Sequence, residues 1–429
     1  MKYYIFLILL FLVSVAGAQN DTPVDSPTVV MNATIHCGDG RVIENGLMAF
    51  YEGKITFLAD ARLVKFDFRG YRVIDAAGKH VYPGLIALNS QLGLREIEMV
   101  RSTNDQRETG YLNPNVRSVI AYNTDSRVIP TVRSNGILLA QIVPQGGRMP
   151  GTSSVMKLDG WNWEDAVYAL DNGLHLNWPG YMQGRWNNGF RYEPDPDYEN
   201  KIQELVQLFS EARVYEQQHK DEPVNLKLEA IGPVFQGEKQ LFIRANKLRE
   251  ISNAVAFAES FGIRPIIVGG EESWMMAAEL ASKEIPVVLE AVDRLPVSPD
   301  EHTSGPYELP AVLTKSGVTC AISVSNDGSS FWNMRNLPFQ AGTAAGYGLS
   351  KEEALTCITL NPARILGIDD HTGSLDLQKD ATFLISEGDL LDMRSSKVIQ
   401  AFIQGQEVEL HNWQEALFNK FRKKYGLTD

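Results

Sequence analysis

Asn89 and Gln91 stand two positions apart at the end of an apolar run that follows Pro83 and Gly84. Residues two apart in a strand point to the same side, so this spacing predicts two side chains that face one site. A pair of His at that spacing could hold a single metal ion. The carboxamide oxygens of Asn and Gln are neutral and are poor ligands for zinc-like ions. The pair therefore predicts a site that is poorly suited to a transition metal.

Four further polar residues are candidates for binding a ligand at the same site. Asp105 and Glu108 follow the apolar run, Lys157 lies on a strand expected at 154–158, and His175 is the His that could approach the site. Each carboxylate could instead cap or pair on a loop, and Lys157 could be a solvated or salt-bridged side chain. The seven His residues show no pairing at i+2, i+3 or i+4, so the sequence predicts no His-based metal site.

Short apolar strands alternate with helices through the middle of the chain. Such alternation indicates a parallel sheet, either an open doubly wound sheet or a (β/α)8 barrel with its chemistry at the carboxyl ends of the strands. Runs rich in β-branched and aromatic residues, at 29–82 and 381–403, predict a second, small sheet. The expected strands of the middle region are 136–143, 241–245, 265–268, 285–289 and 317–324, and the expected helices are 198–219, 251–261, 273–283 and 309–315.

Two regions of the sequence resemble the amidohydrolase superfamily, and in particular its imidazolonepropionase-like members. The run Tyr82-Pro83-Gly84-Leu85-Ile86-Ala87-Leu88 is similar to the segment that opens that barrel, and 348–381 is similar to its last helix and the return to the β-sandwich. The resemblance implies an α/β fold, a (β/α)8 TIM-like barrel plus a small β-sandwich built from both chain ends. The predicted parts are 19–82 and 371–412 for the sandwich, 83–370 for the barrel and 413–429 for a C-terminal helix.

The same resemblance implies metal ligands at the ends of particular strands. The His-x-His positions of strand one read Asn89 and Gln91, the His of strand five reads Arg244, and the His of strand six reads Gly269. Guanidinium has no lone pair to give to a metal. We therefore expect no metal ligands and no cofactor here.

Strand eight of the resemblance implies one Asp, which here is Asp327 or, in a second alignment of equal weight, Ser325. The run around Asp327 is also typical of a simple turn. We expect Arg244 to supply positive charge where relatives hold their metal, beside Asp327, Glu108 or a ligand carboxylate.

Residues 159–198 hold four of the seven Trp residues, interspersed with Gly and Pro. This composition predicts a long irregular excursion over the barrel mouth. It could be a lid for a planar or sugar-like ligand, a docking surface for a partner, or a loop that packs on itself.

The composition and the N-terminal segment limit the classes of protein to which this chain can belong. A net charge of −13 argues against a nucleic-acid partner. Lys2, the apolar run 5–15 and Ala16-Gly17-Ala18 predict a signal peptide (1–18) cleaved near Ala18/Gln19, and hence a secreted or periplasmic protein. No later segment has the apolar length of a membrane span.

Three functions are consistent with these features. We expect an impaired (pseudo-)amidohydrolase that binds a small molecule at the barrel mouth, and whose partner would be an active paralogue or a second copy. The alternative is a hydrolase of carbon–nitrogen bonds with an atypical site of Asp327, Lys157 and Arg244, and only this alternative would need a zinc-type divalent metal. The third is an interaction module that docks a protein through the aromatic excursion.

Overall fold

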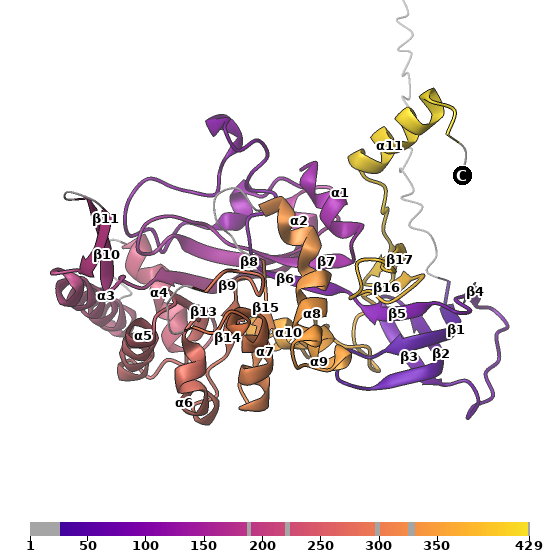
Figure 1. Cartoon of the computed structure of the whole chain (residues 1–429), viewed down its shortest axis with the longest axis horizontal. Helices are drawn as coiled ribbons and strands as arrows, with labels where there is room; N and C mark the ends of the chain where they lie inside the picture. Colours follow the sequence, from indigo (N-terminus) through magenta and orange to yellow (C-terminus); the bar gives the residue numbers. More distant parts are fainter. Residues whose placement is uncertain (1–25, 187–189, 219–223, 297–300, 325–330, 428–429) are drawn as a thin grey trace, which may run out of the picture.

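The computed structural model describes residues 26–186, 190–218, 224–296, 301–324 and 331–427. The body consists of a barrel region and a smaller sheet beside it, and the C-terminal helix projects from the body, with its first turn in contact with the barrel (Figure 1). In this described part of the chain, no helix combines the length and the apolar character that crossing a membrane requires.

The smaller sheet is built from both ends of the chain. Strand β5 from the N-terminal part pairs antiparallel with β16 from the C-terminal part, and the rings of Phe50, Phe383 and Phe402 meet in the core of this sheet. The prediction that the two chain ends share one β domain is therefore confirmed. Its strands are β1 (Thr28–His36), β2 (Val42–Tyr51), β3 (Lys54–Asp60), β4 (Arg72–Asp75), β5 (His80–Pro83), β16 (Phe383–Ser386), β17 (Val398–Ile403) and β18 (Gln406–Glu407).

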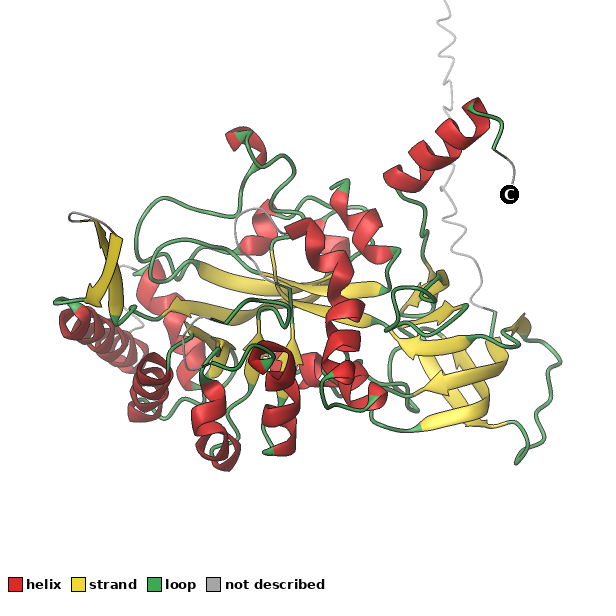
Figure 2. Cartoon of the chain, viewed as in Figure 1, coloured by secondary structure: helices red, strands yellow, loops and turns green. Residues whose placement is uncertain are grey.

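A second sheet of eight strands forms the barrel (Figure 2). Its order is β15-β14-β13-β12-β9-β8-β7-β6, and among these strands only β8 runs antiparallel to its neighbours. The hydroxyl of Ser323, just after β15, donates to the carbonyl oxygen of Leu88 in β6 at 2.6 Å, so the barrel is nearly closed. The strands are β6 (Leu85–Ser90), β7 (Ile137–Ile142), β8 (Gly151–Lys157), β9 (Val167–Asn177), β12 (Gln240–Ala245), β13 (Ile266–Gly269), β14 (Val287–Leu289) and β15 (Cys320–Ile322).

Helices follow most of the barrel strands and bury one apolar face each. In α5, Ile251, Ala254 and Val255 recur at helical spacing and are buried where the helix packs near β12. The helices are α1 (Val128–Arg133), α2 (Trp163–Ala166), α3 (Tyr198–Gln218), α4 (Leu226–Phe235), α5 (Leu248–Ser260), α6 (Ala277–Ser282), α7 (Gly305–Lys315), α8 (Leu337–Gly346), α9 (Lys351–Thr356), α10 (Leu360–Leu366) and α11 (Trp413–Lys424), with short 3-10 turns η1 (Arg101–Thr103), η2 (Ser118–Ala121), η3 (Ser273–Met276) and η4 (Phe331–Asn336).

The predicted irregular excursion at 159–198 is wrong for most of its length. Residues Val167–Asn177 form β9, a barrel strand that pairs with β8 and β12. Beyond β9, the described residues form a hairpin of β10 (Met182–Trp186) and β11 (Phe190–Pro194). The Trp residues of this region lie in different surroundings, since Trp178 is buried whereas Trp161 is 93% exposed. Asp171, Asn172 and Gly173 in the middle of β9 are residues that strands usually avoid, and they concealed the strand in the sequence.

Candidate functional site

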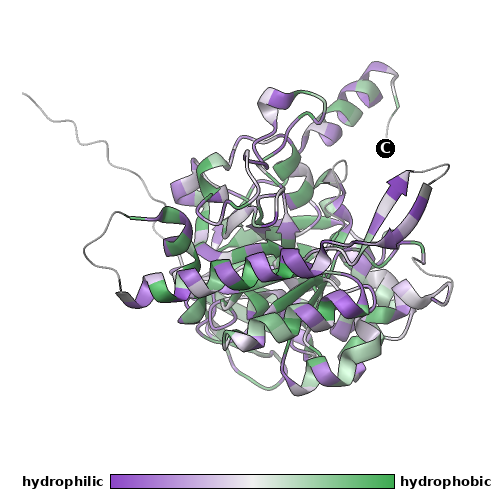
Figure 3. Cartoon of the chain, turned by 90° about the vertical axis from the view of Figure 1, so that its left-hand side faces the viewer, coloured by the Kyte–Doolittle hydropathy of each residue, from purple (hydrophilic) through white to green (hydrophobic). Residues whose placement is uncertain are grey.

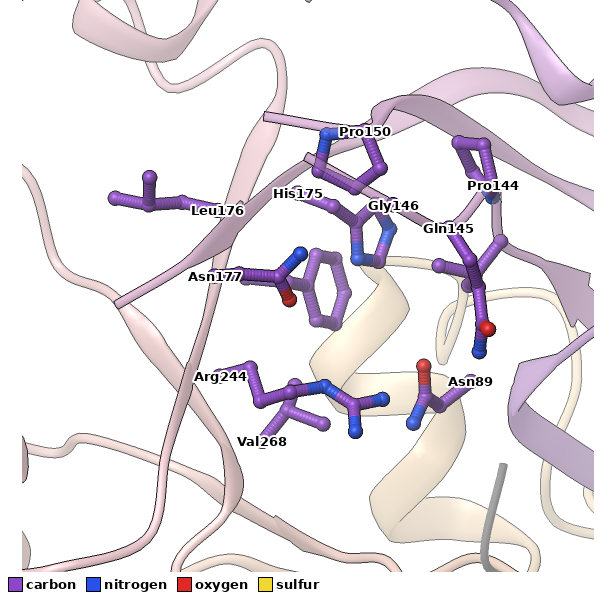
Figure 4. A pocket seen from close by; sticks show the side chains of 12 residues that line it. Asn89, Pro144, Gln145, Gly146, Pro150, His175, Leu176, Asn177, Arg244 and Val268 are labelled. Carbon is purple, nitrogen blue, oxygen red and sulfur yellow. The ribbon is translucent and has the colours of Figure 1, made fainter. Parts of the chain in front are cut away.

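A cavity of about 310 Å³ opens where the carboxyl ends of five parallel barrel strands converge (Figure 4). Its wall combines apolar side chains, three carboxamides, one imidazole and one guanidinium. This volume suits a small molecule. The lining residues are Asn89, Val143, Pro144, Gln145, Gly146, Pro150, His175, Leu176, Asn177, Phe242, Arg244 and Val268.

Arg244 carries the one permanent charge of that lining, and it is paired with Glu290, which follows β14. Arg244 Nη2 lies 2.6 Å from Glu290 Oε1, and Nη1 donates to Oε2 at 3.1 Å. Asn89 Nδ2 donates to the same Oε1 at 2.8 Å, and Figure 4 shows Asn89 and Arg244 pointing toward one another. The carboxylate is thus held on both oxygens. We expected Arg244 to lie beside Asp327, Glu108 or a ligand carboxylate; among the described residues its partner is Glu290 and not Glu108.

Asn89 and Gln91 do not act as the side-by-side pair that an extended strand predicts. Asn89 has a φ of 53°, and the pairing of β6 with β7 shifts register near this point. Regular alternation of side chains requires continuous extended backbone, so it is interrupted at Asn89. Gln91 accepts from Arg95 Nη1 at 3.3 Å, whereas Asn89 donates to Glu290. Of the two, only Asn89 belongs to the cavity wall.

His175 lies in the wall of the cavity as a buried, neutral ring. It stacks on Phe242 with ring centroids 4.9 Å apart, and its Nε2 lies 2.8 Å from Ser153 Oγ. Burial, assisted by the positive charge of Arg244, lowers the pKa of His175 from its ordinary 6.5 to about 3. The imidazole therefore adds a hydrogen-bonding group to the cavity at neutral pH, but no charge.

The lowered pKa of His175 predicts a loss of stability in mild acid. Between pH 6.5 and about 3 the unfolded chain binds a proton at this residue and the folded chain does not, so stability is present above pH 6.5 and declines below it. From pH 6.5 to 5 we expect the free energy of unfolding to fall by about 2 kcal/mol from this group. Urea unfolding at several pH values measures the slope. This dependence of stability on pH should become weaker in His175→Asn. It should persist in the control His371→Asn, which changes an exposed His. Equal slopes in the wild type and both variants would contradict the lowered pKa of His175.

Lys157 does not reach the barrel mouth, contrary to the prediction. It ends β8, which runs antiparallel, and it lies opposite Leu139 near the beginning of β7. The carboxyl end of an antiparallel strand lies at the opposite rim from those of its neighbours. Lys157 accordingly lines a different cavity, which it shares with Gln404 and Glu407 of the smaller sheet.

Asp105 and Glu108 lie on an exposed loop and do not line the mouth cavity. Glu108 Oε1 accepts from the backbone nitrogen and the hydroxyl of Thr109, which is a local capping contact. Asp327 and Ser325, the two candidates for strand eight, lie outside the described residues.

The described side chains at the mouth do not fit a divalent cation. Arg244 places a permanent cation there, both oxygens of Glu290 are engaged by donors, and Gly269 has no side chain. Over the part of the chain that the structure describes, no three His, Cys, Asp or Glu residues are grouped so that they could hold a metal ion. Whether the protein binds a metal remains a prediction for metal analysis to test.

Sequence reasoning missed Glu290, the residue that organises the cavity charge. A signal was available, because Glu290 directly follows the strand expected at 285–289, and side chains at strand ends meet at the mouth of a parallel barrel. The resemblance implies site residues at the ends of strands one, five, six and eight, but none at the end of strand seven, which is β14. The buried group of Ser153 and Gln141 behind His175 gave no comparable signal.

Comparisons with known proteins agree with this fold. Residues 271–408 match a family model described as Amidohydrolase family. The fold is similar to an amidohydrolase from Thermotoga maritima MSB8, with a TM-score of 0.77 and 23% identity, covering 89% of this chain and 99% of that chain. It is also similar to a prolidase complexed with N-methylphosphonate-L-proline, with a TM-score of 0.55 and 16% identity, covering 90% of this chain and 100% of that chain. An adenosine deaminase from Xanthomonas campestris with bound Zn is similar as well, with a TM-score of 0.52 and 14% identity, covering 92% of this chain and 97% of that chain. No curated protein matches the chain.

Proposed function

We propose that the chain is a member of the amidohydrolase superfamily and that it is a metal-independent protein that binds a small polar molecule in the mouth cavity. One observation carries the proposal. The Arg244–Glu290 pair stands at the strand ends where the resemblance implies a metal. The superfamily fold by itself does not confer chemistry.

The cavity wall supports a ligand that forms hydrogen bonds. Its charge is internally balanced, because Arg244 is paired with Glu290 and His175 is neutral at pH 7. Three carboxamides, from Asn89, Gln145 and Asn177, add donors and acceptors beside apolar walls. We propose that the ligand is a small molecule whose polar groups meet these amides.

Export and partnership are further parts of the proposal. The charged and apolar pattern of residues 1–18 supports a cleaved signal peptide and a secreted or periplasmic protein. A ligand-binding barrel of this kind would work beside an active paralogue that retains His-x-His, or as a pair of identical chains. N-terminal sequencing of the exported protein and identification of what co-purifies with it test these two parts.

Metal analysis is the central test of the proposed function. Protein produced in zinc-supplemented medium should carry substoichiometric zinc, nickel or manganese, because the mouth residues that the structure describes include no suitable set of ligands. Native mass spectrometry of the same sample should reveal the bound small molecule, and this species should be lost in Arg244→Ala and kept in Arg185→Ala, whose ion pair with Glu193 is exposed. One tightly bound metal ion per chain would contradict the proposal.

A hydrolase of carbon–nitrogen bonds is the second candidate. Two of the similar structures are described as a prolidase and an adenosine deaminase, and Glu290 places a carboxylate beside the cavity. Such an enzyme would use Asp327 and Arg244, without Lys157, which lies at the other rim. Turnover of dipeptides or N-acyl amino acids that Arg244→Ala abolishes would favour this candidate over simple binding.

A further inference from the structure

The C-terminal helix α11 presents an aromatic face that the described chain does not cover. Phe418 and Phe421 of α11 and Tyr425 just after it recur at helical spacing, and each is between 47% and 67% exposed. Trp413 lies on another side of the helix, where Arg127 Cζ is 5.2 Å from its ring centroid. None of the residues of α11 is buried. The helix stands clear of the body in Figure 1, and Figure 3 shows hydrophobic and hydrophilic segments mixed along it. Such a face is unusual for a protein surface unless it meets something apolar.

Positive charge accompanies this aromatic face. The helix carries Lys420, Arg422, Lys423 and Lys424 against one acidic residue, Glu415, in a chain whose net charge is −13. The cations border the rings, since Lys424 Nζ lies 5.4 Å from the ring centroid of Tyr425. The surface that complements α11 is therefore apolar at its centre and negatively charged around it.

The base of α11 is fixed to the barrel. Asn412 Nδ2 donates to Ser134 Oγ at 3.1 Å, and Thr131 Oγ1 donates to Gln414 Oε1 at 2.6 Å. Asn412 also caps the helix, accepting from the backbone nitrogen of Glu415 at 2.9 Å. These contacts hold the first turn on α1, and the basic last turn lies at the far end of the helix.

We propose that α11 is a membrane-surface anchor that lies in the headgroup region of an anionic lipid bilayer. Aromatic rings on one side and Lys and Arg beside them are the composition of interfacial helices, in which the rings enter the apolar boundary and the long cationic stems reach the headgroups. Three of the four cations are Lys, a residue type depleted at the cores of protein interfaces. This favours lipid over a second copy of the chain as the occupant.

Vesicle co-sedimentation of the full chain tests the anchor. We expect binding to vesicles of equal parts phosphatidylglycerol and phosphatidylcholine, and much weaker binding to phosphatidylcholine alone. Lys420→Glu with Lys423→Glu should reduce the partition coefficient at least roughly tenfold, and Phe418→Ser with Phe421→Ser should reduce it by a similar factor. Because α11 has no buried residue, these variants should fold normally, which circular dichroism and melting curves confirm.

Matched control variants on other surfaces distinguish a specific role of α11 from a general effect of net charge or of exposed apolar side chains. Lys65→Glu with Lys227→Glu makes the same change in net charge at exposed positions, and Leu63→Ser with Met99→Ser removes apolar side chains that are 83% and 92% exposed. Both controls should bind like the wild type, and all variants share the same N-terminal segment. Equal binding by every variant, no binding to anionic vesicles, or a dimer in light scattering that the α11 variants disrupt would each overturn the proposal.

Discussion

Replacing Arg244 with Ala should lower the free energy of unfolding by about 2–3 kcal/mol and abolish ligand binding in the mouth cavity. The substitution leaves Glu290, whose side chain is 17% exposed, without its bidentate partner. A largely buried carboxylate without a counter-charge is costly. Partial exposure of Arg244, 35% of its side chain, keeps the loss below that of a fully buried pair. Urea unfolding at pH 7 and native mass spectrometry measure the two effects.

A double-variant comparison separates the charge pair from general damage at the site. Arg244→Ala combined with Glu290→Gln should be more stable than Arg244→Ala alone, because the second change removes the uncompensated charge. Arg185→Ala, which breaks an exposed pair with Glu193, should cost less than about 1 kcal/mol. Unchanged stability and unchanged ligand binding in Arg244→Ala would show that the pair does not organise the cavity.

Gly269→Ala should also destabilise the protein, by about 2–3 kcal/mol. Gly269 has a φ of +95°, a conformation that favours Gly, and a Cβ atom built there would lie 2.1 Å from Asn246 Oδ1. Strain and overlap therefore act together. The same geometry opposes a side chain at position 269, so a metal ligand could not be introduced there by a single substitution. Urea unfolding at neutral pH measures the loss.

Two comparisons divide the effect of Gly269→Ala into its parts. Gly262→Ala has a similar backbone requirement, with a φ of +66°, but its Cβ would meet nothing within 4 Å, so it should cost only about 1 kcal/mol. Asn246→Ala together with Gly269→Ala removes the overlapping oxygen and should recover part of the stability. If Gly269→Ala lowers the free energy of unfolding no more than Gly262→Ala does, the overlap with Asn246 does not contribute to the loss of stability.

The fold was predictable to a large extent because its signals are local. Alternating apolar strands and helices, such as 241–245 followed by 251–261, indicated a parallel sheet, and the structure has β12 and α5 at these places. The direction of β8 could also have been inferred. Only eight residues, 143–150, separate β7 from β8, and a parallel crossover needs a dozen or more.

The site was predictable only in part. The sequence placed Arg244 and His175 correctly at the mouth, because each lies near the carboxyl end of a parallel strand. It misplaced Lys157 and grouped Asn89 with Gln91, because strand direction and the φ of one residue override simple spacing. Asp327 and Ser325 remain predictions.

The sequence by itself determined which side chains occupy the strand ends, with Asn89, Arg244 and Gly269 at positions where the resemblance implies His. Only the tertiary structure decided which of them meet. Arg244 and Glu290 belong to different strands, β12 and the end of β14, and they come together through the intervening strand β13. Residue type and periodicity are properties of short segments, whereas the rim at which a strand ends and the charges that face one another depend on pairing between distant segments.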